Sequence, residues 1–299
     1  MKRFILIIGT ICLLSIPALA ANKVYVASIH PLAAILNELT LGRATVQQLI
    51  PSGASPHTYE PRPSDIRTVQ SGEAFFYVSP LLDGWASKLP AKQKIEVIEL
   101  VPANMRYKTL EGHHHEGAGH EAGHDGDESD PHFWTDPLTV KALVPSLVKE
   151  LTRLDPDGSR VYKNNANNFS DKLDTQHQAM TKQLASVKGK SLFMFHPSFQ
   201  YLMKRYGLVL GGVIEPSPGK EPSPRYLQQM VKQIKAKKAA AIFTEPQLPQ
   251  RPAQILAESA KVTVYTLDPI GGIKGRQSYF ELLNYNTLVL QKALSTKTK

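Results

Sequence analysis

Four side chains that can bind a metal ion lie in predicted loops, three of them after a predicted strand and His132 after the His-rich segment. They are His57 in PSGASPHTYE, His132 in DPHFWTDP, His196 at the start of HPSF and Asp268 at the start of DPIGG. Ligands of open α/β sheets bind where loops leave the carboxyl ends of strands, so these positions suit a binding site. A proline adjoins each of the four residues and restricts the backbone, which lowers the entropy lost when ligands converge on an ion. The pattern predicts one metal site built from both halves of the chain.

The donor types indicate which metal such a site would prefer. Three neutral imidazoles and one carboxylate form a tetrahedral, borderline-soft set that matches Zn²⁺, whereas a manganese site would contain more oxygen. Each residue alone also has an ordinary interpretation, since a histidine at a strand end is usually hydrogen-bonded and Asp268 could cap a turn. The hypothesis depends on four donors recurring at comparable positions. Glu60 is a reserve ligand or a surface charge.

A second group of histidines lies in the segment 112–130, GHHHEGAGHEAGHDGDESD. It contains almost nothing that can enter a core, so we expect a solvated loop. Its five histidines, with neighbouring carboxylates, could bind zinc weakly and pass it inward; these are His113, His114, His115, His120 and His124. A solvated loop without a metal role is the alternative.

The first twenty residues, MKRFILIIGTICLLSIPALA, have the pattern of a cleavable secretory signal peptide. We therefore expect an exported, periplasmic protein that begins near Ala21. The only cysteine, Cys12, would be removed with this segment, so thiolate is excluded as a ligand and stability must come from a hydrophobic core. The formal net charge is +9, but lysine and arginine are scattered along the chain, and nucleic-acid binding is not predicted.

Strand-like and helix-like segments alternate in two similar halves, which indicates an α/β fold with mainly parallel sheets in two lobes. The predicted strands are 23–29, 44–50, 74–79 and 95–100 in the first half, and 191–195, 208–214, 239–243 and 262–267 in the second. The predicted helices are 31–40, 64–72, 82–89, 198–206, 225–238, 251–260 and 279–294. A polar stretch over 159–187, with apolar residues on one face, predicts a connecting helix about 40 Å long. This divides the chain into residues 1–20, a lobe over 21–158, the helix over 159–187 and a lobe over 188–299.

Together, these residues resemble the metal-specific solute-binding proteins of bacterial ABC transporters, the cluster that includes zinc-binding ZnuA-like proteins and manganese-binding relatives. The resemblance covers nearly the whole mature chain. Its motifs, in the family's order, are GASPHTYEPRPSD, SDPHFWTDP, FHPSFQYLMKRYGL, VIEPSPGKEPSP, IFTEPQ and LDPIGG. It implies two (β/α)4 lobes joined by one long rigid α-helix. It also implies that Zn²⁺ is the transported ligand and that a membrane permease with a cytoplasmic ATPase receives it. We expect a monomer without enzymatic activity.

Carried over by motif, the family's ligands fall on His57, His132 and His196, with Asp268 or water at the fourth position. Manganese relatives place glutamate at the third position, so His196 favours zinc. Two departures are Pro197, where relatives often have an acidic residue, and the absence of a disulfide that some zinc members carry. The alternatives are a manganese- or iron-binding member, a free periplasmic metal buffer, and a zinc hydrolase, since three histidines with an open fourth position could activate water.

Overall fold

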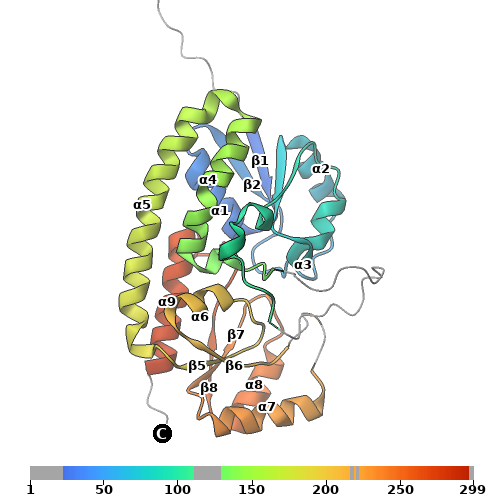
Figure 1. Ribbon diagram of the computed structural model, residues 1–299. Coiled ribbons are helices and arrows are strands. Elements are labelled where there is room, and N and C mark those ends of the chain that lie inside the picture. The colour runs from blue at the N-terminus through green and yellow to red at the C-terminus, as the bar shows by residue number, and fades with distance from the viewer. Residues whose placement is uncertain (1–22, 111–128, 216–218, 220–221, 296–299) are drawn as a thin grey trace, which may run out of the picture.

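The computed structural model describes residues 23–110, 129–215, 219 and 222–295 (Figure 1). The predicted signal peptide and the five histidines at positions 113, 114, 115, 120 and 124 lie outside these residues. Within them, the chain forms two α/β lobes beside one long helix.

The N-terminal lobe is a four-stranded sheet in the order β2-β1-β3-β4, and all of its strand pairs are parallel. The strands are β1 (Lys23–Ala27), β2 (Ala44–Gln48), β3 (Ala74–Tyr77) and β4 (Lys94–Glu96). The helices between them are α1 (His30–Thr40), α2 (Pro63–Ser71) and α3 (Pro80–Asp83), the last followed by a 3-10 helix, Gly84–Lys88. Strand β3 is buried along its whole length, as expected for a parallel strand covered on both faces.

The C-terminal lobe repeats this topology, with parallel strands in the order β6-β5-β7-β8. Its strands are β5 (Ser191–Met194), β6 (Val209–Val213), β7 (Ala241–Thr244) and β8 (Thr263–Thr266). Its helices are α6 (Gln200–Tyr206), α7 (Pro224–Ala236), α8 (Arg251–Ala260) and α9 (Tyr279–Ser295). The same strand order in both lobes brings the carboxyl ends of both sheets toward the space between them (Figure 1).

The long helix α5 (Ser159–Leu184) runs along one side of both lobes (Figure 1). It buries a single face, which includes Tyr162, Phe169, Leu173, Met180 and Leu184. This face packs against α4 (Pro137–Leu154), α1 and α9. A 26-residue helix fixed at so many points is stiff, so it sets the spacing of the two lobes. The predicted fold, two parallel α/β lobes joined by a long helix, is confirmed.

The structure departs from the prediction at the end of one strand and in one additional helix. The strand expected over 95–100 ends at Glu96. The last hydrogen bonds to β3 and the residue after it run from Val97 N to Tyr77 O and from Ile98 N to Val78 O. Beyond them the chain turns into a 3-10 helix over Ile98–Leu100. Helix α4 was not predicted at all, since Pro145 interrupts its sequence pattern. Pro145 is exposed, so water can satisfy the carbonyl group that loses its helical partner.

No helix in the described part of the chain combines the length and the apolar character that crossing a bilayer requires.

Candidate metal centre

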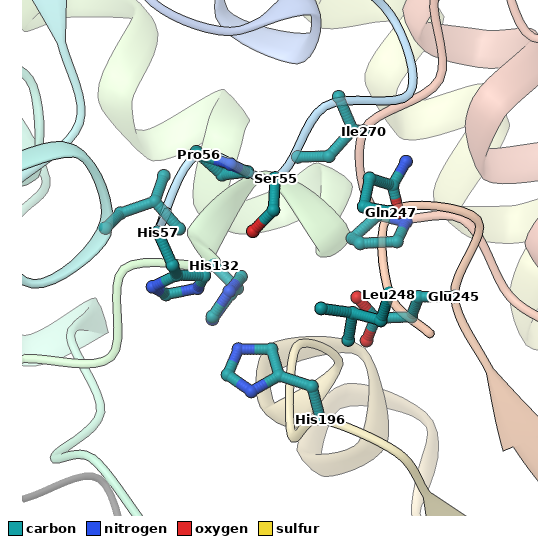
Figure 2. A pocket seen from close by; sticks show the side chains of 11 residues that line it. Ser55, Pro56, His57, His132, His196, Glu245, Gln247, Leu248 and Ile270 are labelled. Carbon is teal, nitrogen blue, oxygen red and sulfur yellow. The ribbon is translucent and has the colours of Figure 1, made fainter. Parts of the chain in front are cut away.

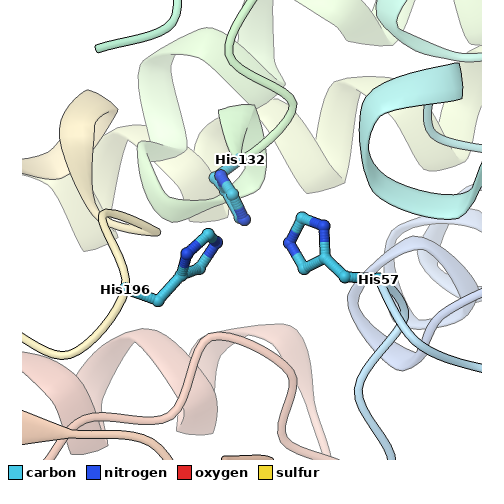
Figure 3. Close-up of side chains that lie close together, drawn as sticks. All are labelled: His57, His132 and His196. Carbon is cyan, nitrogen blue, oxygen red and sulfur yellow. The ribbon is translucent and has the colours of Figure 1, made fainter. Parts of the chain in front are cut away.

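Three imidazole side chains converge between the lobes (Figure 3). His57, His132 and His196 each offer one ring nitrogen, and these nitrogens all lie within 4.8 Å of one another. Zn–N bonds of about 2.0–2.1 Å would place two donors of a tetrahedron about 3.4 Å apart, so small movements suffice to close the site on an ion. His132 and His196 are each 2% exposed, and His57 is partly buried. The structure therefore brings together three of the four residues that the sequence singled out.

Each histidine is delivered by a separate segment. His196 comes directly after β5, where the bond from Phe195 N to Phe243 O continues the pairing with β7. His57 lies in the loop between β2 and α2, which Trp85 holds by donating its indole N–H to Pro56 O at 3.0 Å. Because these segments belong to different lobes, the three rings can share one ion only while the lobes keep their present arrangement.

The orientation of His132 is set by Asp130. The Asp130 Oδ1 atom accepts a hydrogen bond from His132 N at 2.8 Å and lies 3.0 Å from His132 Nδ1. Both side chains are almost fully buried. A neutral imidazole that donates Nδ1–H to this carboxylate presents the lone pair of Nε2 to an ion, and the carboxylate makes that nitrogen more basic. Carboxylate–histidine pairs of this kind orient ligands at many metal sites.

Asp268 lies outside this group of three and already has other partners. Its Oδ1 accepts hydrogen bonds from the Gln247 side chain at 2.8 Å and from Ile270 N and Gly271 N at 3.0 Å. Its Oδ2 accepts one from the Arg276 guanidinium at 2.8 Å. Its role as fourth ligand stays a prediction.

A small cavity adjoins the three rings (Figure 2). It is lined by Ser55, Pro56, His57, Leu82, His132, His196, Glu245, Gln247, Leu248, Pro269 and Ile270. The acidic group in this lining is Glu245, which accepts a hydrogen bond from the Ser198 hydroxyl. Burial raises the pKa of Glu245 to about 8, and the nearby charges of Asp268 and Glu215 act in the same direction. The cavity thus combines three imidazoles, one buried carboxyl and apolar walls.

Glu245 was not predicted from the sequence, although a signal was present. It directly follows strand β7 in the motif IFTEPQ, which is the same strand-end position that identified His196. Of the other candidates, Glu60 is exposed and does not join the group. His30 is the first residue of α1, and its Nδ1 lies 2.9 Å from Gln48 Oε1.

The sequence matches the ZnuA family, described as zinc-uptake complex component A, periplasmic, over residues 26–293. The chain belongs to the ZnuA family. Members of this family are periplasmic or lipoprotein components that work with ABC transporters in zinc uptake. The resemblance drawn from the sequence motifs is confirmed.

Curated ZnuA-family relatives share about a quarter to a third of their residues with this chain. The zinc uptake protein ZnuA of Yersinia pestis is 30% identical, over 91% of this chain and 91% of its own. The zinc-binding lipoprotein AdcA of Streptococcus pneumoniae is 27% identical over 98% of this chain, which spans only 61% of AdcA. A solved structure, a Zn(II)-bound mutant variant of AdcAII from Streptococcus pneumoniae, superimposes with a TM-score of 0.77 and 25% identity. It covers 92% of this chain and 99% of its own.

Proposed function

We propose that this protein captures one Zn²⁺ ion between its two lobes and delivers it to an ABC-type membrane permease for uptake. The observation that carries the proposal is the convergence of His57, His132 and His196 within 4.8 Å of one another. If each histidine only made hydrogen bonds at its own position, the three side chains would not be expected to converge from three separate segments. Family membership and the names of the zinc-binding relatives support the same function.

The donor set favours zinc over the harder divalent ions. Three imidazoles suit Zn²⁺, whereas Mn²⁺ prefers more carboxylate and water oxygen. A manganese- or iron-binding role is therefore the second candidate. Copper can exceed zinc in affinity at nitrogen sites, so a binding preference in solution has to be compared with transport.

A binding role fits the site better than hydrolysis. A zinc hydrolase keeps one position open for water and needs space for a substrate beside it. Here the walls next to the histidines include Leu82, Leu248 and Ile270, which leave a small, largely apolar cavity. We infer a protein without enzymatic activity that acts as a monomer, and we propose lobes over 21–158 and 188–299 joined by the helix over 159–187.

Export and the His-rich segment complete the proposal. Residues 1–20 would direct export and be cleaved. The mature protein would then be in the periplasm, where it can reach the membrane permease. The histidines at 113, 114, 115, 120 and 124 would collect zinc at low affinity. Deleting residues 113–127 should then lower the number of zinc ions bound per chain and leave the tight site intact. An unchanged stoichiometry would reject this role for the segment.

Competitive titration of the metal-stripped mature protein with Zn²⁺ and Mn²⁺ tests the central proposal. We expect one tight zinc site per chain, weaker manganese binding and a large loss of zinc affinity in His196→Ala. The matched control is His177→Ala, which removes an imidazole that contacts Tyr206 away from the cavity. A preference for manganese, or equal zinc affinity in the two variants, would contradict the proposal. Growth of a deletion strain on scarce zinc, restored by the wild-type gene only when the permease is present, separates transport from buffering.

A further inference from the structure

Lysines gather at one end of the C-terminal lobe. Strands β5 to β8 are parallel, so the loops that enter them lie together at the amino end of the sheet, opposite to the carboxyl ends that face the N-terminal lobe (Figure 1). These loops are 188–190, 207–208, 237–240 and 261–262. They contain no acidic residue and five exposed lysines, which we call the lysine face: Lys188, Lys190, Lys237, Lys238 and Lys261.

Contacts between these loops show that they are neighbours in the fold. Gly189 N, between two of the lysines, donates to Gly207 O at 2.7 Å. Lys237, in the loop before β7, reaches β6, where its ammonium group donates to Gly211 O at 2.9 Å. Lysines that are scattered along the sequence therefore share one surface of the folded protein.

The corresponding end of the N-terminal lobe has paired charges. The loops that enter β2, β3 and β4 carry Arg43, Glu73 and Lys92 as their charged residues. Arg43 pairs with Asp155 at 2.6 Å, and Lys92 pairs with Glu73 at 3.1 Å. Among the ion pairs formed within the described residues, none includes a lysine of the lysine face. Because the two lobes share one topology, the fold itself does not require uncompensated charge at this end.

Two lysines of this face have a backbone conformation that favours glycine. Lys238 has a φ of +47° and Lys261 a φ of +57°, and in the described part of the chain these are the two non-glycine residues with positive φ. They follow α7 and α8, where glycine commonly ends a helix. The helix dipole favours a cation near these ends, but a side chain with a Cβ makes this backbone conformation unfavourable. A residue kept in an unfavourable conformation points to a function for its side chain.

We propose that the lysine face binds the surface of an anionic phospholipid bilayer. The cations of this face are all lysines, whose ammonium groups act as point charges and accept many arrangements of phosphate groups, whereas arginine suits fixed, paired geometry. Each lysine close to an anionic membrane strengthens binding by about fivefold. The face can therefore hold the protein reversibly on the membrane that contains its permease.

The position of the lysine face leaves the metal site uncovered. The face lies at the amino ends of the C-terminal strands, whereas His196 directly follows the carboxyl end of β5. Contact with lipid at the end of this lobe would confine the search for the permease to the membrane surface without closing the cavity between the lobes. This inference goes beyond the proposed function and depends on it only for export, since the metal ligands play no part in it.

Co-sedimentation with lipid vesicles tests the proposal. The protein used is the chain from Ala21 onward, which contains every described residue, because the apolar segment 1–20 would itself enter lipid. We expect it to bind vesicles of phosphatidylcholine and phosphatidylglycerol mixed in equal amounts, but not vesicles of phosphatidylcholine alone. Binding should be lost as the salt concentration rises from about 0.1 M to about 1 M, because the screening length shortens from about 10 Å to about 3 Å.

Two double variants each remove two charges from the face. One combines Lys188→Gln with Lys190→Gln, and the other combines Lys238→Gly with Lys261→Gly. Each should weaken binding to the mixed vesicles by about 25-fold and leave the zinc affinity unchanged. The glycine variant should melt at the wild-type temperature or above it, because glycine adopts a positive φ without a Cβ penalty. Weaker vesicle binding by an equally stable protein cannot be ascribed to misfolding.

The matched control combines Lys149→Gln with Lys163→Gln. Both lysines are exposed, and they lie on α4 and α5, away from the lysine face. This variant lowers the net charge by the same amount as the other two, so it should bind the mixed vesicles as the wild type does.

Three outcomes would overturn the inference. The first is a wild-type protein that does not bind the mixed vesicles at low salt. The second is an equal loss of binding in the face variants and the control, which would mean that net charge alone attracts the protein. The third is tighter binding to double-stranded DNA than to the mixed vesicles at the same salt, which would assign the face to nucleic acid. Zinc titration of the same proteins is independent of all three, so failure of this inference is distinguishable from failure of the proposed function.

Discussion

The indole N–H of Trp134 donates a hydrogen bond of 2.7 Å to the carbonyl oxygen of Pro269, and this bond fastens the His132 segment to the C-terminal lobe. Two tyrosines of the same lobe add to it, since Tyr279 donates to Trp134 O at 2.7 Å and Tyr201 donates to Asp130 O at 3.0 Å. All of these groups are buried. His132 comes before α5 in the chain, yet these bonds attach its segment to the C-terminal lobe, which also carries His196. The His57 loop is held instead by Trp85 of the N-terminal lobe.

Removing one of the hydrogen bonds that attach the His132 segment to the C-terminal lobe should destabilise the protein more than removing a similar bond elsewhere. Tyr279→Phe deletes the hydroxyl that donates to Trp134 O and leaves a buried carbonyl unsatisfied, so we expect a loss of about 1–3 kcal/mol in the free energy of unfolding. Tyr285→Phe is the control on the same helix, because its half-buried hydroxyl donates to Thr266 O, which water can reach more easily. Urea unfolding of both variants measures the difference. Equal losses of unfolding free energy in the two variants would show that the bond from Tyr279 to Trp134 O stabilises the protein no more than the control bond does.

Gly272 marks a close approach of the two lobes, and enlarging it should push them apart. Its φ is +80°, and an added Cβ would clash with Ser52 Oγ and lie 3.0 Å from His30 Cγ in the N-terminal lobe. We expect Gly272→Ala to lower both the melting temperature and the zinc affinity, because His57 would move away from the other two imidazoles.

Gly275→Ala is the matched control for this substitution. Gly275 has the same φ of +80°, but nothing lies within 4 Å of its added Cβ. The control therefore reports backbone strain alone. If the two alanine variants bound zinc equally well, the lobe contact at Gly272 would not control the metal site.

The position of the histidines could be predicted because it depends on a local rule. His57 and His196 follow strands, and parallel strands in two similar lobes direct their carboxyl ends toward one space. The same rule applied to IFTEPQ would have found Glu245, but a glutamate in a loop ordinarily indicates a surface charge. Only the register of β5 and β7 shows that this glutamate is buried beside His196.

What could not be predicted depends on contacts between distant residues. The partners of Asp268 include Arg276 and Gln247, and nothing in the motif LDPIGG shows that these side chains would occupy its oxygens. Helix α4 was missed because a proline inside a pattern ordinarily ends a helix, whereas here Pro145 lies on the exposed face. The fold class was robust to such local errors because it follows from the alternation of many elements.

The stability of the protein should fall in acid through the Asp155–Arg43 ion pair. Hydrogen bonding to Arg43 lowers the pKa of Asp155 to about 2, and Tyr162 donates a further bond. Because this pKa is below the value of about 3.9 in an unfolded chain, the pair stabilises the fold above that pH. The contribution is lost as the pH falls toward 2. Asp155→Asn should therefore be less stable than the wild type at pH 7, and the difference should shrink in acid.

Thermal melts from about pH 7 down to about pH 2.5, a range that spans the unfolded-state pKa of an aspartate, check the expectation for Asp155. Asp157→Asn is the exposed control two residues away. The control should follow the wild type at every pH. A gap between Asp155→Asn and the wild type that stayed constant with pH would mean that the ionised pair is not the source of the stabilisation.

Asp130 should tune the metal site without touching the ion. Asp130→Asn keeps the shape of the side chain but removes the charge that polarises His132 Nδ1–H, so Nε2 becomes a weaker donor. We expect zinc affinity to fall by about 10- to 100-fold, the usual cost of losing such a partner, while the visible spectrum of the Co²⁺-loaded protein keeps its tetrahedral character. Asp171→Asn, on the exposed face of α5, controls for the change in net charge. If both variants bound zinc as the wild type does, His132 would not depend on Asp130 for its orientation or its basicity.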